Sequence, residues 1–166
     1  MRVLVVTASK HGSTADIGRA IADVITGEGI EVHVSDPDTM PTLDGVDSVV
    51  LGSAVYAGRW MKSMREFVDA HSAELQELPV WLFSSGPLGD PLKPDEDPVD
   101  VAAIFGATGA RAHRIFPGKL DRRTLNFGER AIVGAFKVPD GDFRDWDEIH
   151  VWAAGIAEEL KTKVAG

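Results

Sequence analysis

The residues best suited to chemistry in this sequence lie together in one short loop near the amino terminus. The loop combines three hydroxyl side chains, one glycine and two basic residues: Ser9, Lys10, His11, Gly12, Ser13 and Thr14. A helix N-terminus carries unpaired N–H groups and a partial positive charge, so hydroxyl groups and a glycine at this point predict a phosphate-binding site. The alternative is an ordinary helix start, with Ser13 or Thr14 as its N-cap.

Two further loops have the composition of ligand-binding loops. The loop over 52–60 holds one aromatic ring among small residues: Ala54, Val55, Tyr56, Ala57 and Gly58. The loop over 84–90 is rich in serine, glycine and proline and includes Ser85, Gly86, Pro87 and Leu88. Trp60 is a second aromatic candidate, although we expect it to pack against the helix that follows it.

The elements that must position these loops alternate along the chain. Short apolar or β-branched runs predict buried strands over 3–6, 30–35, 48–51, 79–83 and 110–116. Apolar residues at three- and four-residue steps predict helices over 13–27, 64–71, 101–105, 125–136 and 149–160. This alternation predicts one α/β domain over 1–166, with a five-stranded parallel sheet covered on both faces. Ligands of such sheets bind outside the carboxyl ends of the strands, where the three loops lie.

Composition excludes several kinds of protein. The chain has 166 residues and no cysteine, which excludes disulfides, thiolate metal sites and cysteine nucleophiles. The remaining histidines (His33, His71, His113 and His150) lack metal-ligand spacing, so we expect no metal site. No apolar run is long enough for a signal-peptide core or a membrane span, which predicts a cytoplasmic protein with at most peripheral membrane contact.

Charge is distributed unevenly along the chain. The formal net charge of −9 argues against nucleic acid as the partner. Segment 90–100 is acidic and segment 111–137 is basic. Solvated helix faces explain both segments in the ordinary way. The alternative is a basic surface beside the site that attracts an acidic partner.

The first loop resembles the phosphate-binding signature of the flavodoxin family, Thr/Ser-x-x-Gly-x-Thr, and Ser9–Thr14 matches this signature in register. The resemblance implies a three-layer sandwich with strand order 2-1-3-4-5, and FMN as the cofactor. The sequence departs from the family at Thr7, where an aromatic residue is usual, and at Gly18, where alanine is usual. Both departures are expected to concern packing rather than contact with phosphate.

The resemblance also implies roles for the other two loops. Tyr56 takes the position of the aromatic ring that lies against the isoalloxazine, and Val55 and Ala57 supply backbone polar groups beside it. The backbone of 85–88 lines the pyrimidine edge, and Leu88 covers the ring. No side chain is expected to act as a catalytic acid or base, because FMN itself performs the redox chemistry.

Several stretches are similar to the flavodoxin-domain branch that includes menaquinone-dependent protoporphyrinogen IX dehydrogenase. They are Gly52–Gly58, Met64–Val68, Phe116–Leu120 and Asp145-Trp146. The segment 120–143 is shorter here than in that enzyme, and Tyr56 replaces a basic residue. This resemblance implies an FMN-dependent oxidoreductase that uses a porphyrinogen or a quinone. The alternative is a non-enzymatic FMN electron carrier that docks to protein partners.

Overall fold

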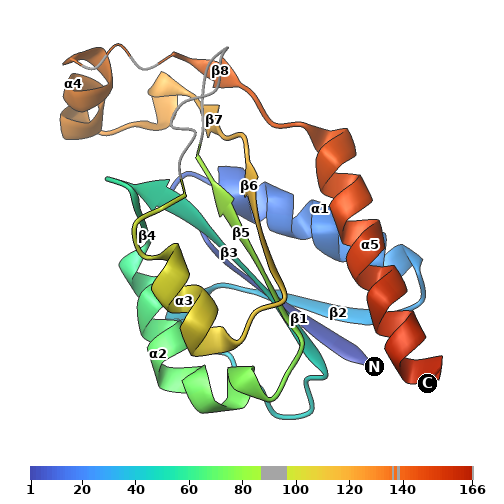
Figure 1. Ribbon diagram of the computed structural model, residues 1–166. Helices are drawn as coiled ribbons and strands as arrows, with labels where there is room; N and C mark the ends of the chain where they lie inside the picture. Colours follow the sequence, from blue (N-terminus) through green and yellow to red (C-terminus); the bar gives the residue numbers. More distant parts are fainter. Residues whose placement is uncertain (87–96, 136, 138, 166) are drawn as a thin grey trace.

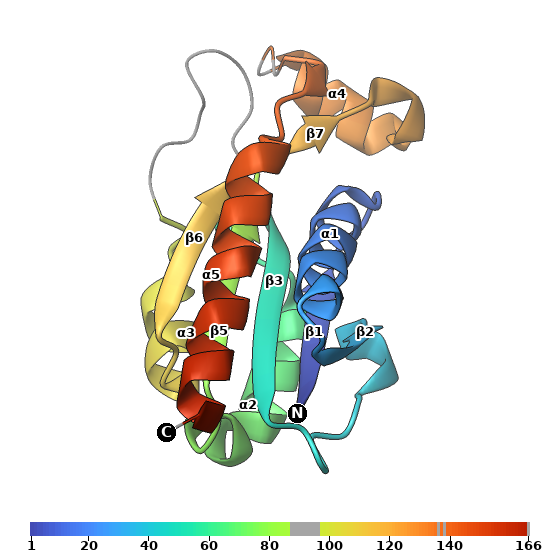
Figure 2. The same ribbon diagram turned by 90° about the vertical axis from the view of Figure 1, so that its right-hand side faces the viewer.

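The computed structural model describes residues 1–86, 97–135, 137 and 139–165, and Figures 1 and 2 show it from two sides. The strands of the main sheet are β1 (Arg2–Ala8), β2 (Glu31–Ser35), β3 (Ser48–Tyr56), β4 (Arg59–Trp60), β5 (Val80–Ser85) and β6 (Ala112–Phe116). The α-helices are α1 (Ser13–Gly27), α2 (Lys62–Gln76), α3 (Val101–Thr108), α4 (Phe127–Ala135) and α5 (Trp146–Ala165). Two short strands, β7 (Lys119–Leu120) and β8 (Gly141–Asp142), and two 3-10 turns, Pro37–Thr39 and Arg122–Thr124, complete the chain.

The sheet has the predicted topology. Its order is β2-β1-β3-β5-β6 with every neighbouring pair parallel, which is 2-1-3-4-5 when the long strands are counted in chain order. Alternate residues of β1 face opposite layers: Val3 and Val5 pack with α1 and α5, while Leu4 and Val6 pack with α2. Helices therefore cover both faces of the sheet (Figure 2), and the fold is the expected flavodoxin-like sandwich.

The strands extend further toward the carboxyl edge than the sequence predicted. Residues 52–56, expected in a loop, continue β3 and pair with the antiparallel strand β4. A two-residue turn joins the strands, and both of its residues have positive φ angles, 50° at Ala57 and 73° at Gly58. A turn with this backbone matches the twist of the flanking strands, although it usually carries Asn or Gly at its first position. Ser84 and Ser85 likewise belong to β5 rather than to a loop.

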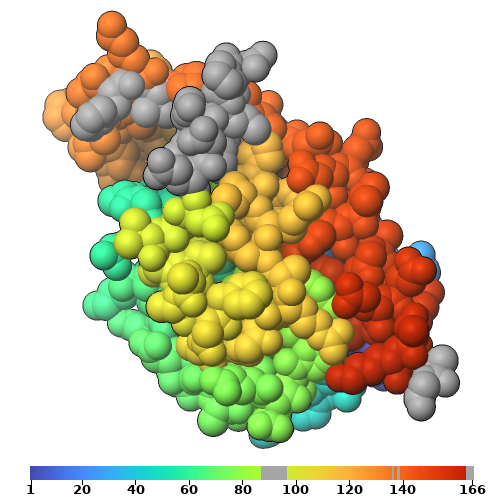
Figure 3. Space-filling view, in the orientation of Figure 1, coloured from blue at the N-terminus to red at the C-terminus, as the bar shows by residue number. Residues whose placement is uncertain are grey.

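An excursion of the chain between β6 and α5 lies beyond this edge. It consists of β7, α4 and β8, and β7 pairs with β8 in a separate antiparallel ribbon. Figure 3 shows α4 and its neighbours as an orange projection at one end of the molecule. No residue of α4 is buried in a core, so this helix is held by surface contacts. No helix in the described part of the chain is long and apolar enough to cross a membrane.

The two departures from the flavodoxin signature pack against each other. Thr7 is 4% exposed, and the Cβ that an alanine would place at Gly18 lies 2.4 Å from the Thr7 methyl carbon. The next-nearest atoms, Thr7 Cβ and Val5 Cγ1, are both 3.5 Å away, which is an ordinary contact distance. The threonine methyl group thus occupies the space that a side chain at position 18 would need.

This contact predicts that the effect of Gly18→Ala on the free energy of unfolding changes sign when Thr7 is replaced by alanine. Gly18→Ala should lower the free energy of unfolding by about 1 kcal/mol in the native background, because overpacking outweighs the better helix propensity of alanine. In a Thr7→Ala background, the same substitution should raise it by about 1 kcal/mol, since the obstructing methyl group is gone. Denaturant unfolding of the four proteins measures both values.

Gly155 provides a matched control. It lies within α5, and no atom comes within 4 Å of the position of an added Cβ. Gly155→Ala should therefore stabilise the protein in either background. Equal effects of Gly18→Ala with and without Thr7 would show that the contact is unimportant.

Candidate cofactor-binding site

A cavity of about 640 Å³ opens at the carboxyl edge of the sheet, within the size range of ligand pockets. The predicted loops contribute Ser9, His11, Ser13, Thr14, Ala54, Val55, Tyr56, Ala57, Ser85 and Gly86 to its lining. Lys10, Gly12 and Gly58 belong to the same loops but do not line it, and Pro87 and Leu88 lie outside the described residues. The rest of the lining comes from the excursion: Gly118, Lys119, Leu120, Leu125, Glu129, Ile132 and Val133.

One end of the cavity is the start of α1. The N-cap residue is Gly12, with φ 87°, and no side chain caps the helix. The expected alternative, a helix capped by Ser13 or Thr14, is therefore wrong. The backbone N–H of Gly12 donates to Ser9 Oγ at 3.0 Å, which folds the loop back on itself. Among the residues that the structure describes, no side chain caps the first turn of α1, so its N–H groups are available to bind an anion.

The Ser13 hydroxyl is the second notable group at this end of the cavity. Ser13 Oγ is buried and has no hydrogen-bond partner among the described residues. A buried polar group without a partner is unfavourable and calls for a specific explanation. Thr14 beside it is 1% exposed and also lines the cavity. Two hydroxyl side chains and uncapped N–H groups therefore converge where a phosphate group would find several donors.

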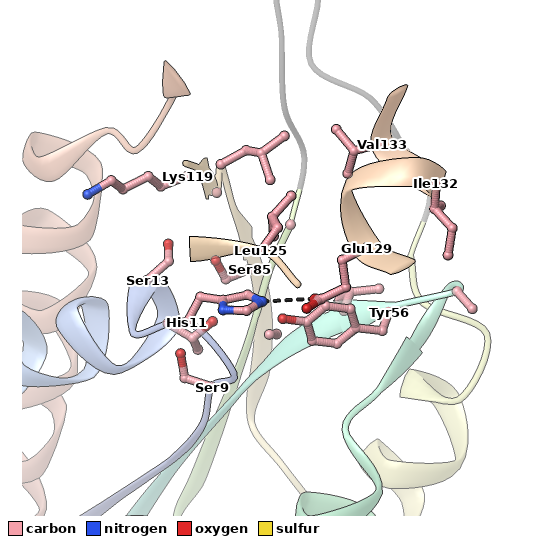
Figure 4. Close-up of a pocket in the computed structure, with 17 residues that line it drawn as sticks. Ser9, His11, Ser13, Tyr56, Ser85, Lys119, Leu125, Glu129, Ile132 and Val133 are labelled. Carbon is pink, nitrogen blue, oxygen red and sulfur yellow. Dashed lines mark hydrogen bonds and ion pairs between the residues drawn. The ribbon is translucent and has the colours of Figure 1, made fainter. Parts of the chain in front are cut away.

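The opposite wall carries an aromatic ring. Tyr56 is 43% exposed and lies at the end of β3, next to the turn at Ala57–Gly58. Burial of the hydroxyl group, together with the negative charge of Glu129, raises the pKa of Tyr56, so the phenol stays neutral. In Figure 4 the ring lies beside the His11–Glu129 pair, at the centre of the cavity lining.

Trp60, the other aromatic candidate, does not line the cavity. It is 1% exposed, and its indole Nε1 donates to Ser84 Oγ at 2.7 Å. The expectation that Trp60 packs in the core is confirmed.

Helix α4 is joined to the first loop by a carboxylate. Glu129 Oε2 lies 2.9 Å from His11 Nε2 and 3.2 Å from Lys10 Nζ. The hydrogen bond from His11 is the main cause that lowers the pKa of Glu129 to about 2. Glu129 is therefore anionic under all ordinary conditions and compensates the positive charge of the loop.

Sequence reasoning missed this contact. Asn126 and Glu129 form a capping box: Glu129 N donates to Asn126 Oδ1 at 2.8 Å, and Asn126 N donates to Glu129 Oε1 at 3.3 Å. The Asn-x-x-Glu spacing is a visible sequence signal for a helix start. It does not show that the second carboxylate oxygen reaches a loop 118 residues away.

Arg144 is a second residue that sequence reasoning missed. Its side chain is 6% exposed and pairs with Asp142 at 2.7 Å and with Asp16 at 3.3 Å. It also donates to the backbone oxygen of Ser13 at 3.4 Å and stacks 4.6 Å from the centre of the Trp146 ring. Arg144 thereby joins the return of the excursion to the first turn of α1.

Three of the arginines in the basic stretch 111–137 are paired with acids. Arg111 pairs with Glu159 and Arg114 with Glu148, both on α5. Arg123 pairs with Asp121 at 2.9 Å. The acidic stretch is largely outside the described residues. Within it, Asp100 is buried, where it accepts hydrogen bonds from Trp60 N at 3.2 Å.

Comparison with known proteins supports the same fold. The chain superposes on a flavodoxin from the domain Archaea with a TM-score of 0.68 and 19% identity, over 97% of this chain and 99% of that one. It superposes on rubredoxin oxygen:oxidoreductase from Desulfovibrio gigas with a TM-score of 0.70 and 15% identity, over 99% of this chain but 37% of that one. A flavodoxin mutant from Pseudomonas aeruginosa gives a TM-score of 0.61 and 14% identity, over 97% and 99%.

No curated protein matches the chain. At these identities the solved structures show a shared fold and nothing finer. The model of the flavodoxin domain family, by contrast, matches residues 4–147. Because that match covers most of the chain, this protein belongs to the flavodoxin domain family, whose members are FMN-binding flavoproteins.

Proposed function

We propose that this protein carries electrons on an FMN held in the cavity, with the phosphate at the N-terminus of α1 and the ring against Tyr56. The observation that carries the proposal is the orphan hydroxyl of Ser13, which is buried beside an uncapped helix start. A phosphate oxygen supplies the acceptor that this hydroxyl lacks. The same oxygen gains the N–H groups and the partial positive charge of the helix end.

Neutral groups hold the phosphate in this proposal. Lys10 is the permanent cation of the loop, and Glu129 already pairs with it while also contacting His11 Nε2. The other donors of the loop are backbone N–H groups and the hydroxyls of Ser9, Ser13 and Thr14. This arrangement gives direction through hydrogen-bond geometry rather than through net charge.

Tyr56 and α4 form the walls for the ring. Tyr56 offers an aromatic face, and Leu125, Ile132 and Val133 offer apolar side chains from the excursion. Aromatic and apolar surfaces stack well on a flat ring system. The bound flavin supplies the redox chemistry. The chain orients it, shields part of it from water and leaves its exposed edge for a partner.

A protein partner fits the outer surface of this site. Tyr56 is 43% exposed, and nearby Val99, whose N–H bonds to Gly58 O at 2.8 Å, is 72% exposed. Exposed apolar residues around a redox centre give a partner a contact surface. The net charge of −9 favours a basic partner, because opposite charge speeds docking.

A small acceptor such as a quinone is the second candidate. The apolar wall of Leu125, Ile132 and Val133 over the cavity favours it. A porphyrinogen, whose carboxylates need cations, is less favoured, because three arginines of the basic stretch, Arg111, Arg114 and Arg123, are already paired with acids.

Purified protein should carry a yellow chromophore that denaturation releases as FMN. Ser13→Ala should weaken FMN binding about tenfold, the usual effect of removing one hydrogen bond to a charged group. It should not destabilise the apoprotein, since the hydroxyl has no partner there. Fluorescence quenching of FMN measures the affinity, and denaturant unfolding measures the stability.

Ser72→Ala is the matched control. Ser72 Oγ donates to Ala107 O at 2.9 Å, away from the cavity. This variant should lose stability and keep its affinity for FMN, the reverse of Ser13→Ala. Colourless protein that refuses added FMN would contradict the proposal outright.

The contact between Glu129 of α4 and the first loop should persist in acid. Because the folded-state pKa of Glu129 is about 2 and the ordinary value is 4.5, the contact is present above pH 4.5. It is lost only as the pH falls through about 2. In a carbon NMR titration of the Glu129 carboxyl group, His11→Ala should move the midpoint back toward 4.5, because His11 is the main cause of the shift.

His33→Ala is the control for this titration. It removes a similar contact, His33 Nε2 to Glu31 Oε1 at 2.8 Å, in another part of the molecule. The midpoint of Glu129 should not respond to it. A midpoint near 4.5 in the native protein would show that α4 is not held by this carboxylate.

Kinetics separates the two partner classes. Transfer from reduced protein to a basic protein acceptor should slow as ionic strength rises, because salt screens the attraction. Transfer to an uncharged quinone should be insensitive to salt and should fall in Ile132→Ser, which makes the apolar wall polar. Salt-independent transfer to the protein acceptor would argue against the carrier.

A further inference from the structure

Ser84 lies at the centre of a buried hydrogen-bond relay that FMN binding does not explain. It is fully buried near the end of β5. On one side, Trp60 Nε1 donates to Ser84 Oγ at 2.7 Å. On the other side, His113 Nε2 lies 2.7 Å from the same oxygen. The relay therefore crosses from β4 through β5 to β6.

Chemistry fixes the direction of this relay at Trp60, and the surroundings of His113 favour its direction at the other end. An indole N–H can only donate, so Ser84 accepts from Trp60. Its single hydroxyl hydrogen is then available to His113 Nε2, which must carry a lone pair to accept it. The other ring nitrogen, Nδ1, faces Asp97 Oδ1 at 3.9 Å, which favours the hydrogen on that side. The relay is complete when His113 is neutral with its hydrogen on Nδ1.

The relay connects three walls of the cavity. Trp60 pairs with Val55 in the hairpin that carries Tyr56. Ser84 is followed directly by Ser85 and Gly86, which line the cavity. His113 lies on β6, which leads to Gly118. Gly118 lies close to the backbone of Gly86, because a Cβ added at Gly118 would be 3.3 Å from it. In Figure 3, β6 runs between α3 and α5 on the visible face.

We propose that His113 is a positioning residue, whose unprotonated Nε2 holds the Tyr56 hairpin in place through Ser84 and Trp60. A proton on Nε2 turns this nitrogen into a donor. Ser84 then receives two donors, and its own hydrogen loses this acceptor. The hairpin loses a directed link to the sheet, and FMN affinity falls. The last step rests on the proposed function; the relay itself does not.

The surroundings of His113 set the pH range. Its side chain is 9% exposed, and burial lowers the pKa of His113 while Asp97 partly opposes the shift. Within the described part of the chain, Asp97 is the charged group that faces the imidazole. Asp100 and Arg65 lie at the Trp60 end, 3.8 Å apart. The relay is thus intact above the ordinary histidine pKa of 6.5 and is lost as the pH falls below it.

Proton NMR of the apoprotein tests the relay without FMN. The Trp60 indole N–H signal, assigned with Trp60→Phe, should move with the same midpoint as the imidazole protons of His113. Amide signals of Tyr56, Ala57 and Gly58 should follow it. In His113→Gln these movements should vanish, because the amide oxygen accepts from Ser84 at every pH.

His71→Gln is the matched control, since His71 contacts Glu74 at 2.9 Å on α2, outside the relay. It should leave the Trp60 titration unchanged. If the Trp60 signal is constant while His113 titrates, the relay is wrong. If the indole moves and the hairpin amides do not, the positioning role is wrong.

FMN affinity gives the functional readout. Between about pH 8 and a pH below the midpoint measured for the His113 imidazole, the native protein should lose about fivefold in affinity relative to His113→Gln, the effect of one neutral hydrogen bond. Taking the ratio cancels the titration of the FMN phosphate, with a pKa of about 6. His113→Leu should bind about fivefold more weakly even at pH 8, and His113→Gln should restore the binding.

A ratio that is constant with pH would overturn the link to FMN. If FMN binds to no variant at any pH, the proposed function fails. The amide titration of the apoprotein then still decides whether His113 positions the hairpin.

Discussion

Parallel pairing of the strands places every functional segment at one edge of the sheet. Each parallel strand needs a crossover before the next can begin, so the carboxyl ends of β1, β3, β5 and β6 lie together. Four segments follow directly from those ends: the first loop, the Tyr56 hairpin, the Ser85–Gly86 segment and the start of the excursion. The cavity is therefore a product of topology, and the side chains only decide what it holds.

Charge is a second constraint, because in the proposed complex a chain with a net charge of −9 holds a dianionic phosphate group. The loop would not do so by concentrating cations, since Glu129 compensates the charge of Lys10 and also contacts His11. Donors fixed by the helix backbone avoid the need for cations, because their partial charges are held in place by the fold. The same carboxylate that neutralises the loop also fixes α4 over the cavity, so electrostatic balance and the shape of the wall depend on one residue.

Much of this arrangement could be predicted from the sequence. The buried run before Ser9 and the helical pattern after Ser13 indicate a strand, a loop and a helix, and five such units imply a parallel sheet covered on both faces. The strand order that the sheet has was implied by the family resemblance. The identity of the N-cap was not predictable from preference alone. Gly12 takes the left-handed backbone and the cap position, and the Ser13 hydroxyl has no partner among the described residues.

Other features depend on contacts that no local pattern encodes. The hairpin after Gly52 was missed because Ala57–Gly58 lacks the Asn-Gly signal of a tight turn. The contact of Glu129 with the first loop joins residues far apart in the sequence, and its helix has no buried face to reveal its orientation. Family resemblance supplied the cofactor but says nothing of the Trp60–Ser84–His113 relay, which consists of residues that each look unremarkable alone.

The separation of His11 and Glu129 has a consequence for how the protein assembles. Contacts between distant residues form only after the intervening chain has been made and ordered. The segment between them contains β2, β3, β5 and β6, so during synthesis the whole sheet emerges before α4. The first loop is therefore built early and stays open, and its outer wall arrives late, after the surface on which it rests has formed.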